Sequence, residues 1–332
     1  MNKHQIHAVP TNIITGFLGV GKTSAIMHLL KQKPKAERWA ILVNEFGEIG
    51  IDGSLFKGQQ SEEQGFFIRE VPGGCMCCAA GVPMQVALNQ LLLKAKPDRL
   101  LIEPTGLGHP LEVLQVLKSE HYKESLLLQK TITLVDARKL TDLRYTSHDT
   151  FNQQIAMADI IIGNKLDLYQ GEDQANLLAY VKAIGKASAQ IEFTQQGEID
   201  LSLLQGSNLT DSVAAASHHH SHDSQTLAAD LPIPECGFIK ATNQGEGFSS
   251  IGWRFSADKI FNHRRLFSFL ADLKVERMKG SFITDNGLIG YNLTTDALTA
   301  TDLQECLESR IEIIADSIRD DLEVELLSCL DS

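Results

Sequence analysis

Short apolar runs alternate with longer amphipathic stretches over the first two hundred residues. Runs rich in β-branched and other large apolar residues predict strands at residues 9–15, 40–44, 99–103, 131–135, 159–163 and 191–194. Between these runs, apolar positions recur at helical spacing, which predicts helices at residues 22–31, 83–94, 109–117 and 172–184. Alternation of apolar strands with helices is typical of a parallel sheet covered on both faces. We therefore expect an α/β domain that binds its ligand at the carboxyl ends of the strands.

The pattern changes near residue 205, where large apolar residues become rare. Residues 206–234 are rich in Ser, Ala, Asp and His, which is typical of a mobile linker. Beyond it, we predict strands at 247–256 and 310–315, a pair of strands at 275–293 that turns at TDNG, and helices at 259–273 and 317–330. The chain is thus expected to divide into a first domain at 1–205, a linker at 206–234 and a smaller α+β domain at 235–332.

Charge and hydropathy exclude several classes of protein. The formal net charge of −12 argues against a general nucleic-acid binder, which needs a basic surface. The N-terminus has no long apolar stretch like that of a secretory signal, and no run approaches the roughly 18 apolar residues of a membrane span. We expect a cytoplasmic protein without nucleic-acid or membrane partners. In that compartment, clustered cysteines are more often metal ligands or catalytic groups than disulfides.

Residues 16–23, GFLGVGKT, match the phosphate-binding pattern G-x-x-x-x-G-K-[ST] between a predicted strand and a predicted helix. This context favours a P-loop NTPase domain with a mainly parallel sheet over a glycine-rich turn that holds a lysine by chance. Backbone N–H groups from Gly19 through Val20 and Gly21 to Thr23 are expected to surround the β-phosphate. Lys22 is expected to reach the β- and γ-phosphates, and the Thr23 hydroxyl is expected to bind Mg²⁺.

A second motif, Asn164-Lys165-Leu166-Asp167, follows the predicted strand at 159–163 and has the N-K-x-D pattern of GTPases. The Asp167 carboxylate can accept two hydrogen bonds from guanine, which adenine cannot offer in that arrangement. Lys165 can lay its aliphatic stem along the base, and Asn164 can tie this loop to the phosphate loop. The bound nucleotide is therefore expected to be GTP rather than ATP.

Two further segments indicate how a γ-phosphate is sensed. Glu103 ends a predicted buried strand in LLIEPTGLGHP, where a carboxylate can hold Mg²⁺, and Gly106 can offer its N–H to the γ-phosphate. Glu45, Glu48 and Asp52 lie in NEFGEIGID, which we interpret as a nucleotide-responsive segment. Taken alone, Glu103 is a helix-capping carboxylate and NEFGEIGID is a solvated acidic loop. Their place beside the other motifs favours the functional interpretation.

The stretch VPGGCMCCAA places Cys75, Cys77 and Cys78 within four positions. No second Cys-x-x-Cys pair accompanies them, so the spacing is not that of a zinc ribbon. Two or three thiolates with a nearby carboxylate favour Zn²⁺, or Co²⁺, in a site with sulfur and oxygen ligands. A structural zinc site, a redox centre and a packing role remain open. The other cysteines, at 236, 306 and 329, are expected to be small buried side chains.

The motifs GFLGVGKT, NEFGEIGID, GGCMCC, EPTGLGHP and NKLD follow one another in this order. This arrangement resembles that of the CobW-type GTPases, a group of P-loop metal chaperones and insertases. The resemblance continues at FTQQGEIDLSLL, where Thr194 takes a place in the guanine-side loop, and at GFSSIGWRFS and VERMKGSF in the C-terminal domain. It covers nearly the whole chain.

The resemblance implies a GTPase that binds a transition metal at Cys-x-Cys-Cys and moves it under the control of GTP. It carries Glu48 over as a metal ligand, although Val43 stands where some relatives have an acidic residue, and His109 stands where many have Asp. By position, the nucleotide contacts fall on Gly19, Gly21, Lys22, Thr23, Ser24, Asn164, Lys165 and Asp167. His218, His219, His220 and His222 in the linker resemble the family's histidine-rich loops. They are equally a weak metal site or a low-complexity spacer.

We therefore expect a slow, Mg²⁺-dependent GTPase that delivers a transition metal, Zn²⁺ before Co²⁺, to a client metalloprotein, with oligomerisation left open. Its catalytic residues are expected to be Lys22, Thr23, Glu103 and Glu45. The alternative is a GTP-dependent regulatory or interaction module whose cysteines are structural or redox-active.

Overall fold

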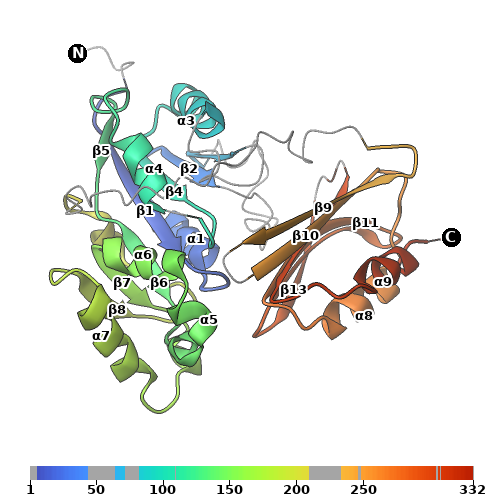
Figure 1. Ribbon diagram of the computed structural model, residues 1–332. Helices are drawn as coiled ribbons and strands as arrows, with labels where there is room; N and C mark the ends of the chain where they lie inside the picture. Colours follow the sequence, from blue (N-terminus) through green and yellow to red (C-terminus); the bar gives the residue numbers. More distant parts are fainter. Residues whose placement is uncertain are drawn as a thin grey trace. The chain divides into compact units, whose positions relative to one another are not determined.

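The computed structural model describes residues 6–43, 64–71, 82–108, 110–208, 233–245, 248–303, 306 and 308–331 (Figure 1). The chain separates into two compact units, whose described residues are those up to 208 and those from 233 onward. The boundaries at 205/206 and 234/235 remain predictions. None of the helices within these described ranges is long and apolar enough to cross a membrane.

The first unit is built on a parallel sheet whose strands are ordered β3-β2-β4-β1-β6-β7-β8, with β5 beside the first half of β1. This arrangement confirms the expected P-loop NTPase domain with a mainly parallel sheet. The strands are β1 (Val9–Gly16), β2 (Trp39–Val43), β3 (Phe66–Glu70), β4 (Arg99–Glu103), β5 (Leu126–Leu128), β6 (Ile132–Val135), β7 (Ile160–Gly163) and β8 (Gln190–Phe193).

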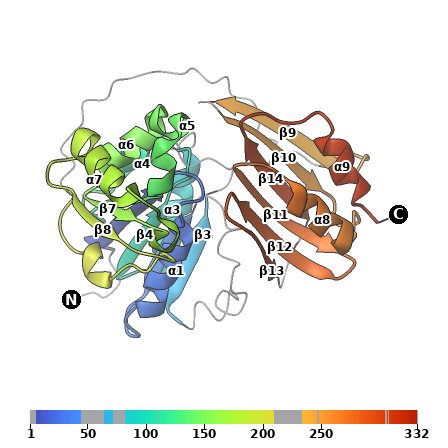
Figure 2. The same ribbon diagram turned by 90° about the horizontal axis from the view of Figure 1, so that it is seen from below.

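Helices cover both faces of this sheet, as the apolar strands require. The longer ones are α1 (Lys22–Gln32), α3 (Val82–Ala95), α4 (Pro110–Leu117), α6 (Asp149–Met157) and α7 (Asp173–Ile184). From β1 the chain crosses the sheet toward the β3 edge to form β2, whereas the crossovers after β3 run toward the β8 edge. Right-handed crossovers therefore place α1 on the face opposite the remaining helices, and Figure 2 shows α1 across the sheet from α4 and α6. Buried residues of α3 and α4 share one core with β1, β2 and β4.

The chain after β8 returns to the middle of the sheet along the α1 face. Ile199 and Leu204 are buried there, and Asn12 of β1 donates from Nδ2 to the Leu204 carbonyl at 3.0 Å. A short 3₁₀ turn, η4 (Leu201–Leu204), lies in this return segment. The described part of the first unit therefore ends, at Asn208, beside β5 and the residue that precedes β6 rather than beside the last strand.

Helix α6 was not expected from the sequence. Its core-facing positions include the polar residues Thr150 and Gln154, which weaken the helical periodicity. Its N-cap is His148, whose Nδ1 accepts from the Thr150 N–H at 3.2 Å in place of the usual Ser, Thr, Asp or Asn. Strands β3 and β5 were also missed, because β5 has only three residues and β3 ends in the charged pair Arg69 and Glu70.

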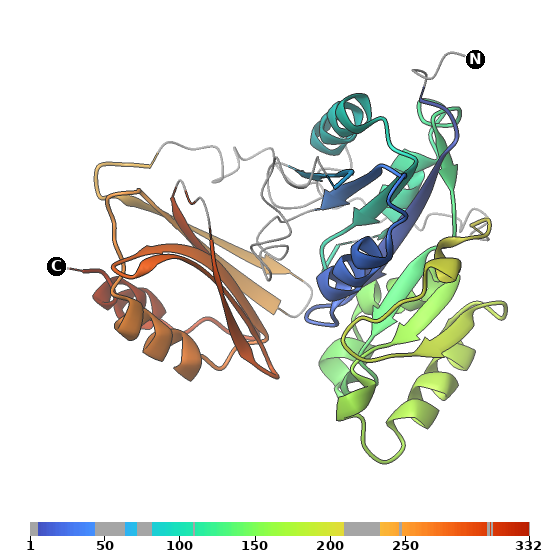
Figure 3. The ribbon, with the colours of Figure 1, turned by 180° about the vertical axis from the view of Figure 1, so that it is seen from behind.

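The second unit is an antiparallel sheet ordered β13-β12-β11-β14-β10-β9, with α8 (His263–Asp272) and α9 (Leu322–Ser328) on one face (Figure 3). Its strands are β9 (Phe238–Gly245), β10 (Phe248–Phe255), β11 (Arg277–Thr284), β12 (Gly287–Thr294), β13 (Leu298–Asp302) and β14 (Ser309–Ala315). Trp253, Phe255, Phe261 and Phe282 lie in the core between sheet and helices. The expected smaller α+β domain is confirmed, although the helix predicted at 317–330 is shorter and β9 and β13 were missed.

Candidate functional site

The phosphate loop joins β1 to α1 and depends on glycine at several positions. Gly16, Gly19 and Gly21 have φ angles of +146°, +65° and +96°, which residues with a Cβ rarely adopt. A Cβ on Gly21 would lie 2.5 Å from the Asn164 amide nitrogen, so this position also needs the smallest residue. Gly21 is the N-cap of α1 and has no side chain to cap the helix. The first N–H groups of α1 are therefore suited to bind an anion.

Lys22 and Thr23, the first two residues of α1, are both 5% exposed. Lys22 Nζ donates to the carbonyls of Gly16 at 3.0 Å and Phe17 at 3.2 Å, which holds the ammonium group over the loop. The Thr23 hydroxyl donates to Glu103 Oε1 at 3.1 Å. A hydroxyl and a carboxylate are hard oxygen ligands of the kind Mg²⁺ binds. These residues therefore fit a nucleoside triphosphate with its magnesium ion.

Asn164 connects the phosphate loop to the loop that follows β8. Its Nδ2 donates to the Val20 carbonyl at 2.8 Å, and its Oδ1 accepts from the Gly197 N–H at 3.1 Å. The predicted tie between Asn164 and the phosphate loop is confirmed. Gly197 has a φ of +73°, and a Cβ there would lie 2.6 Å from the Ala25 backbone nitrogen. The loop after β8 therefore packs directly on the first turn of α1.

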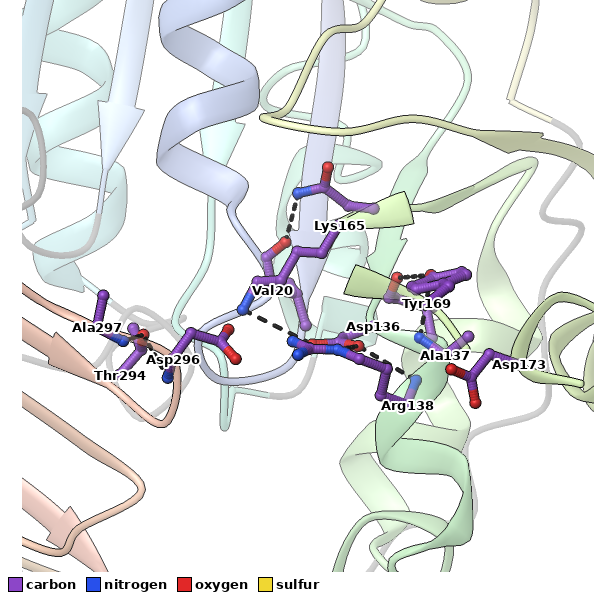
Figure 4. A network of polar contacts seen from close by, with 12 residues as sticks. Val20, Asp136, Ala137, Arg138, Lys165, Tyr169, Asp173, Thr294, Asp296 and Ala297 are labelled. Atoms are coloured by element: carbon purple, nitrogen blue, oxygen red, sulfur yellow. Dashed lines mark hydrogen bonds and ion pairs between the residues drawn. The ribbon is translucent and has the colours of Figure 1, made fainter. Parts of the chain in front are cut away.

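Lys165 has a left-handed φ of +63°, and its side chain extends toward Asp136 (Figure 4). The Lys165 Nζ lies 3.6 Å from Asp136 Oδ2. Asp136 directly follows β6 and is 2% exposed, and Arg138 Nη2 contacts its Oδ2 at 2.6 Å. Asp167 is exposed in the 3₁₀ turn η3 (Leu166–Leu168), where its carboxylate is accessible to a ligand.

Three backbone and hydroxyl contacts support the same end of the site. The Leu166 N–H donates to the Thr194 carbonyl at 2.9 Å, and the Thr194 hydroxyl donates to the Glu198 carbonyl at 2.7 Å. The Tyr169 hydroxyl accepts from the Ala137 N–H at 3.1 Å. Burial raises the pKa of Tyr169 to about 12, so the hydroxyl stays protonated at ordinary pH. The segment around η3 is thus fixed to the segment after β6 (Figure 4).

Gly106 lies in the turn between β4 and α4, directly against the phosphate loop. A Cβ on Gly106 would lie 3.0 Å from the Leu18 nitrogen and 3.1 Å from the Phe17 carbonyl carbon. Gln154 Nε2 donates to the Gly106 carbonyl at 2.9 Å. The Gly106 turn and Glu103 therefore reach the phosphate loop together, as the order of motifs predicts.

The predicted ligands of the transition metal lie outside the described residues: Cys75, Cys77, Cys78, Glu48, His218, His219, His220 and His222. The same is true of Glu45, which is expected to be catalytic, of Asp52 in the expected nucleotide-responsive segment, and of His109. In the described part of the chain, no group of three or more His, Cys, Asp and Glu side chains could hold a metal ion. The metal site remains a prediction.

The isolated cysteines differ in exposure. Cys329 is buried as expected, and burial raises the pKa of its thiol. Cys306 is half-buried, and Cys236 is exposed, so the expectation of burial is wrong for Cys236. Cys236 lies in the turn just before β9, outside the core of the second unit.

Three residues at the site were missed from the sequence: Asp136, Gln154 and Gly197. Asp136 had a usable signal, because it follows an apolar strand in ITLVD much as Glu103 ends the strand in LLIE. Gln154 and Gly197 gave no such signal, because a helical glutamine and a loop glycine are common in surface segments.

Comparison with known proteins gives consistent matches. Residues 10–192 match the family model described as CobW/HypB/UreG, nucleotide-binding domain. The chain is 41% identical to the zinc chaperone YeiR of Escherichia coli (strain K12), over 93% of this chain and 94% of that protein. It is 30% identical to the zinc chaperone CobW of Pseudomonas aeruginosa, over 65% of this chain and 64% of that protein. The Zn(II)-bound YjiA GTPase from E. coli is 21% identical, with a TM-score of 0.47 over 97% of this chain and 99% of that one. On the family match and the similarity to YeiR, the chain belongs to the CobW/HypB/UreG family.

Proposed function

We propose that this protein is a GTP-binding and GTP-hydrolysing metallochaperone that carries a transition metal, Zn²⁺ in the first place, to a client metalloprotein in the cytoplasm. The observation that carries the proposal is the position of Asn164, which joins the phosphate loop to the loop after β8 beside the exposed Asp167. The zinc cargo is supported by the relative YeiR, a protein named as a zinc chaperone and similar over 93% of this chain.

In this proposal the first unit binds GTP along the carboxyl ends of its strands. Asp167 accepts hydrogen bonds from the guanine N1 and amino groups, and the stem of Lys165 lies along the base. Backbone N–H groups of residues 19–24 and the Lys22 ammonium bind the phosphates. Thr23 and Glu103 hold Mg²⁺, supported by the 3.1 Å contact between their side-chain oxygens. Mg²⁺ neutralises charge on the phosphates when it is bound.

The metal is a cargo in this proposal. Cys75, Cys77, Cys78 and Glu48 provide its ligands, and the histidines at 218–220 and 222 provide a weaker second site. Protons compete for thiolate sulfur, so we expect the metal affinity to fall as the pH falls. GTP orders residues 44–52 and brings Glu48 toward the cysteines, and hydrolysis lowers the metal affinity again.

A zinc titration in competition with a chelator tests the cargo site and its coupling. The full chain is titrated with Mg²⁺ and either a non-hydrolysable GTP analogue or GDP, and so is the Cys77→Ser variant. Wild type should bind Zn²⁺ more tightly with the GTP analogue, and Cys77→Ser should lose about tenfold or more in affinity, because a thiolate ligand is lost. Cys236→Ser is the matched control, since Cys236 is exposed and apart from the cluster.

The two parts of the proposal can fail separately. Equal zinc affinity with the GTP analogue and with GDP would contradict the coupling. Unchanged zinc affinity in Cys77→Ser would contradict the assigned cargo site and favour a regulatory module with a structural or redox role for the cysteines.

A further inference from the structure

We propose that Gln154 of α6 is a positioning residue for the γ-phosphate end of the site. Through its hydrogen bond to the Gly106 carbonyl, it holds the turn that distinguishes GTP from GDP. The inference rests on the proposed GTP-binding function. It concerns a residue that is absent from the P-loop, N-K-x-D and EPTG motifs.

The Gly106 turn packs closely against the phosphate loop. Glu103 ends β4, and the Gly108 N–H donates to the Thr105 carbonyl at 3.2 Å to close the turn. A Cβ on Gly106 would lie 3.0 Å from the Leu18 nitrogen, so the backbone itself packs on the phosphate loop. A small rotation of this turn therefore changes what its N–H groups present to a phosphate.

Gln154 contacts this turn from inside the protein. Its side chain is 1% exposed, and its Nε2 donates to the Gly106 carbonyl at 2.9 Å. Its Oε1 is also buried and has no hydrogen-bond partner among the described residues. A buried carbonyl oxygen without a partner costs stability, so an apolar side chain would suit a position with a packing role alone.

Gln154 Oε1 can accept a hydrogen bond if the peptide group between Gly106 and Leu107 rotates. The carbonyl of Gly106 and the N–H of Leu107 point to opposite sides of that one planar peptide group. Gln154 offers a donor for the carbonyl and an acceptor for the N–H, so it can hold either orientation. Glycine at 106 lowers the steric barrier to such a rotation.

Helix α6 gives Gln154 a fixed position relative to the phosphate loop. Phe151, one turn before Gln154 on the same helix face, packs edge-on against the ring of Phe17 with centroids 5.7 Å apart. His148 packs on the same ring at 4.7 Å. The Thr133 hydroxyl of β6 donates to the Gln154 backbone carbonyl at 2.7 Å, which fixes the helix to the sheet. One helix face therefore supports both the phosphate loop and the Gly106 turn.

The experiment compares nucleotide affinities of the full chain and of Gln154→Met. This substitution keeps the length of the side chain and removes both polar atoms. We expect the affinity for a non-hydrolysable GTP analogue with Mg²⁺ to fall about fivefold to tenfold, the value of one buried hydrogen bond that pre-organises the turn. The affinity for GDP should change less than about twofold on the same reasoning, since GDP has no γ-phosphate to contact the turn.

Thr133→Val is the matched control, because it removes the neighbouring buried hydrogen bond to the Gln154 backbone and leaves the Gly106 contact in place. It should lower the thermal midpoint and leave the ratio of GTP-analogue to GDP affinity unchanged. The inference would be overturned if Gln154→Met left the ratio of GTP-analogue to GDP affinity unchanged. It would also be overturned if Thr133→Val changed this ratio as much as Gln154→Met does. Wild type that binds neither nucleotide would instead refute the proposed function.

Gln154→Glu provides a second readout with its own pH dependence. A protonated carboxyl can donate to the Gly106 carbonyl, whereas a carboxylate cannot. Relative to wild type at each pH, we expect this variant to regain its preference for the GTP analogue as the pH falls. A ratio to wild type that is constant with pH would contradict a positioning role for the hydrogen-bond donor.

Discussion

The base end and the γ-phosphate end of the nucleotide site are held in different ways. At the base end, Asn164 bonds two loops, and Asp136 contacts both Lys165 and Arg138. At the γ-phosphate end, the Gly106 carbonyl accepts one side-chain hydrogen bond within the described ranges, from Gln154. The base end is thus pre-organised by several side-chain contacts, whereas the glycine turn at the other end is held through a backbone carbonyl by the side chain of Gln154. This difference suits a site that binds the base in every nucleotide state and responds only to the γ-phosphate.

The largest expected effect tests whether the base end recognises guanine regardless of the phosphates. Asp167→Ala should lower the affinities for GTP and for GDP about 100-fold each, through loss of two hydrogen bonds to a charged acceptor. ATP affinity should be unchanged. Calorimetric titration measures all three, with the exposed Glu172→Ala as control. A loss confined to GTP would break the contrast between the two ends.

A smaller effect is expected from the carboxylate behind Lys165. Asp136→Asn keeps the size of the side chain but removes its charge, so Lys165 Nζ loses its ion pair with the carboxylate oxygen 3.6 Å away. We expect GTP and GDP affinities to fall together by about fivefold, since a partly exposed ion pair contributes about 1 kcal/mol.

The chain offers a close control for this substitution. Asp142 caps a helix and contacts Arg144 two residues later, as Asp136 caps a 3₁₀ turn and contacts Arg138. Asp142→Asn should leave both nucleotide affinities unchanged. If Asp136→Asn alters the GTP affinity but not the GDP affinity, the base end would also sense the γ-phosphate.

The smallest effect concerns the stability of the base end at high pH. Burial raises the pKa of Tyr169 to about 12, above its ordinary value of about 10, so the folded state favours the protonated phenol. The stability that this group contributes is complete below about pH 10 and is lost as the pH rises toward 12. Tyr169→Phe has no such ionisation, so the difference in unfolding free energy between wild type and variant should shrink over that range. Urea titrations at pH 8 and pH 11 measure this difference. A difference that is the same at both pH values would contradict a raised pKa of Tyr169 in the folded state.

The placement of the phosphate loop, Glu103 and Asn164 could be predicted from the sequence, because each follows or ends an apolar strand. Parallel strands bring such residues to one edge, so Glu103 contacts Thr23 and Asn164 contacts the phosphate loop. The supporting residues were harder to predict. Gln154 faces the core from a helix whose polar interior positions hide its periodicity, and Gly197 becomes informative only once α1 lies beside it. Residues that hold other residues in place depend on tertiary contacts that no local pattern records.

The return of the chain to the middle of the first sheet has a mechanical consequence. Near the end of this segment, the Gly206 carbonyl accepts from the Lys130 N–H, and the Asn208 N–H donates to the Leu128 carbonyl. Asn12 of β1 donates to the Leu204 carbonyl. Tension applied to the chain beyond Asn208 is therefore transmitted to β5 and the segment before β6. From there it reaches β1, which pairs with β5 and continues directly into the phosphate loop. A pull at that point therefore loads the middle of the sheet before it reaches the edge strand β8.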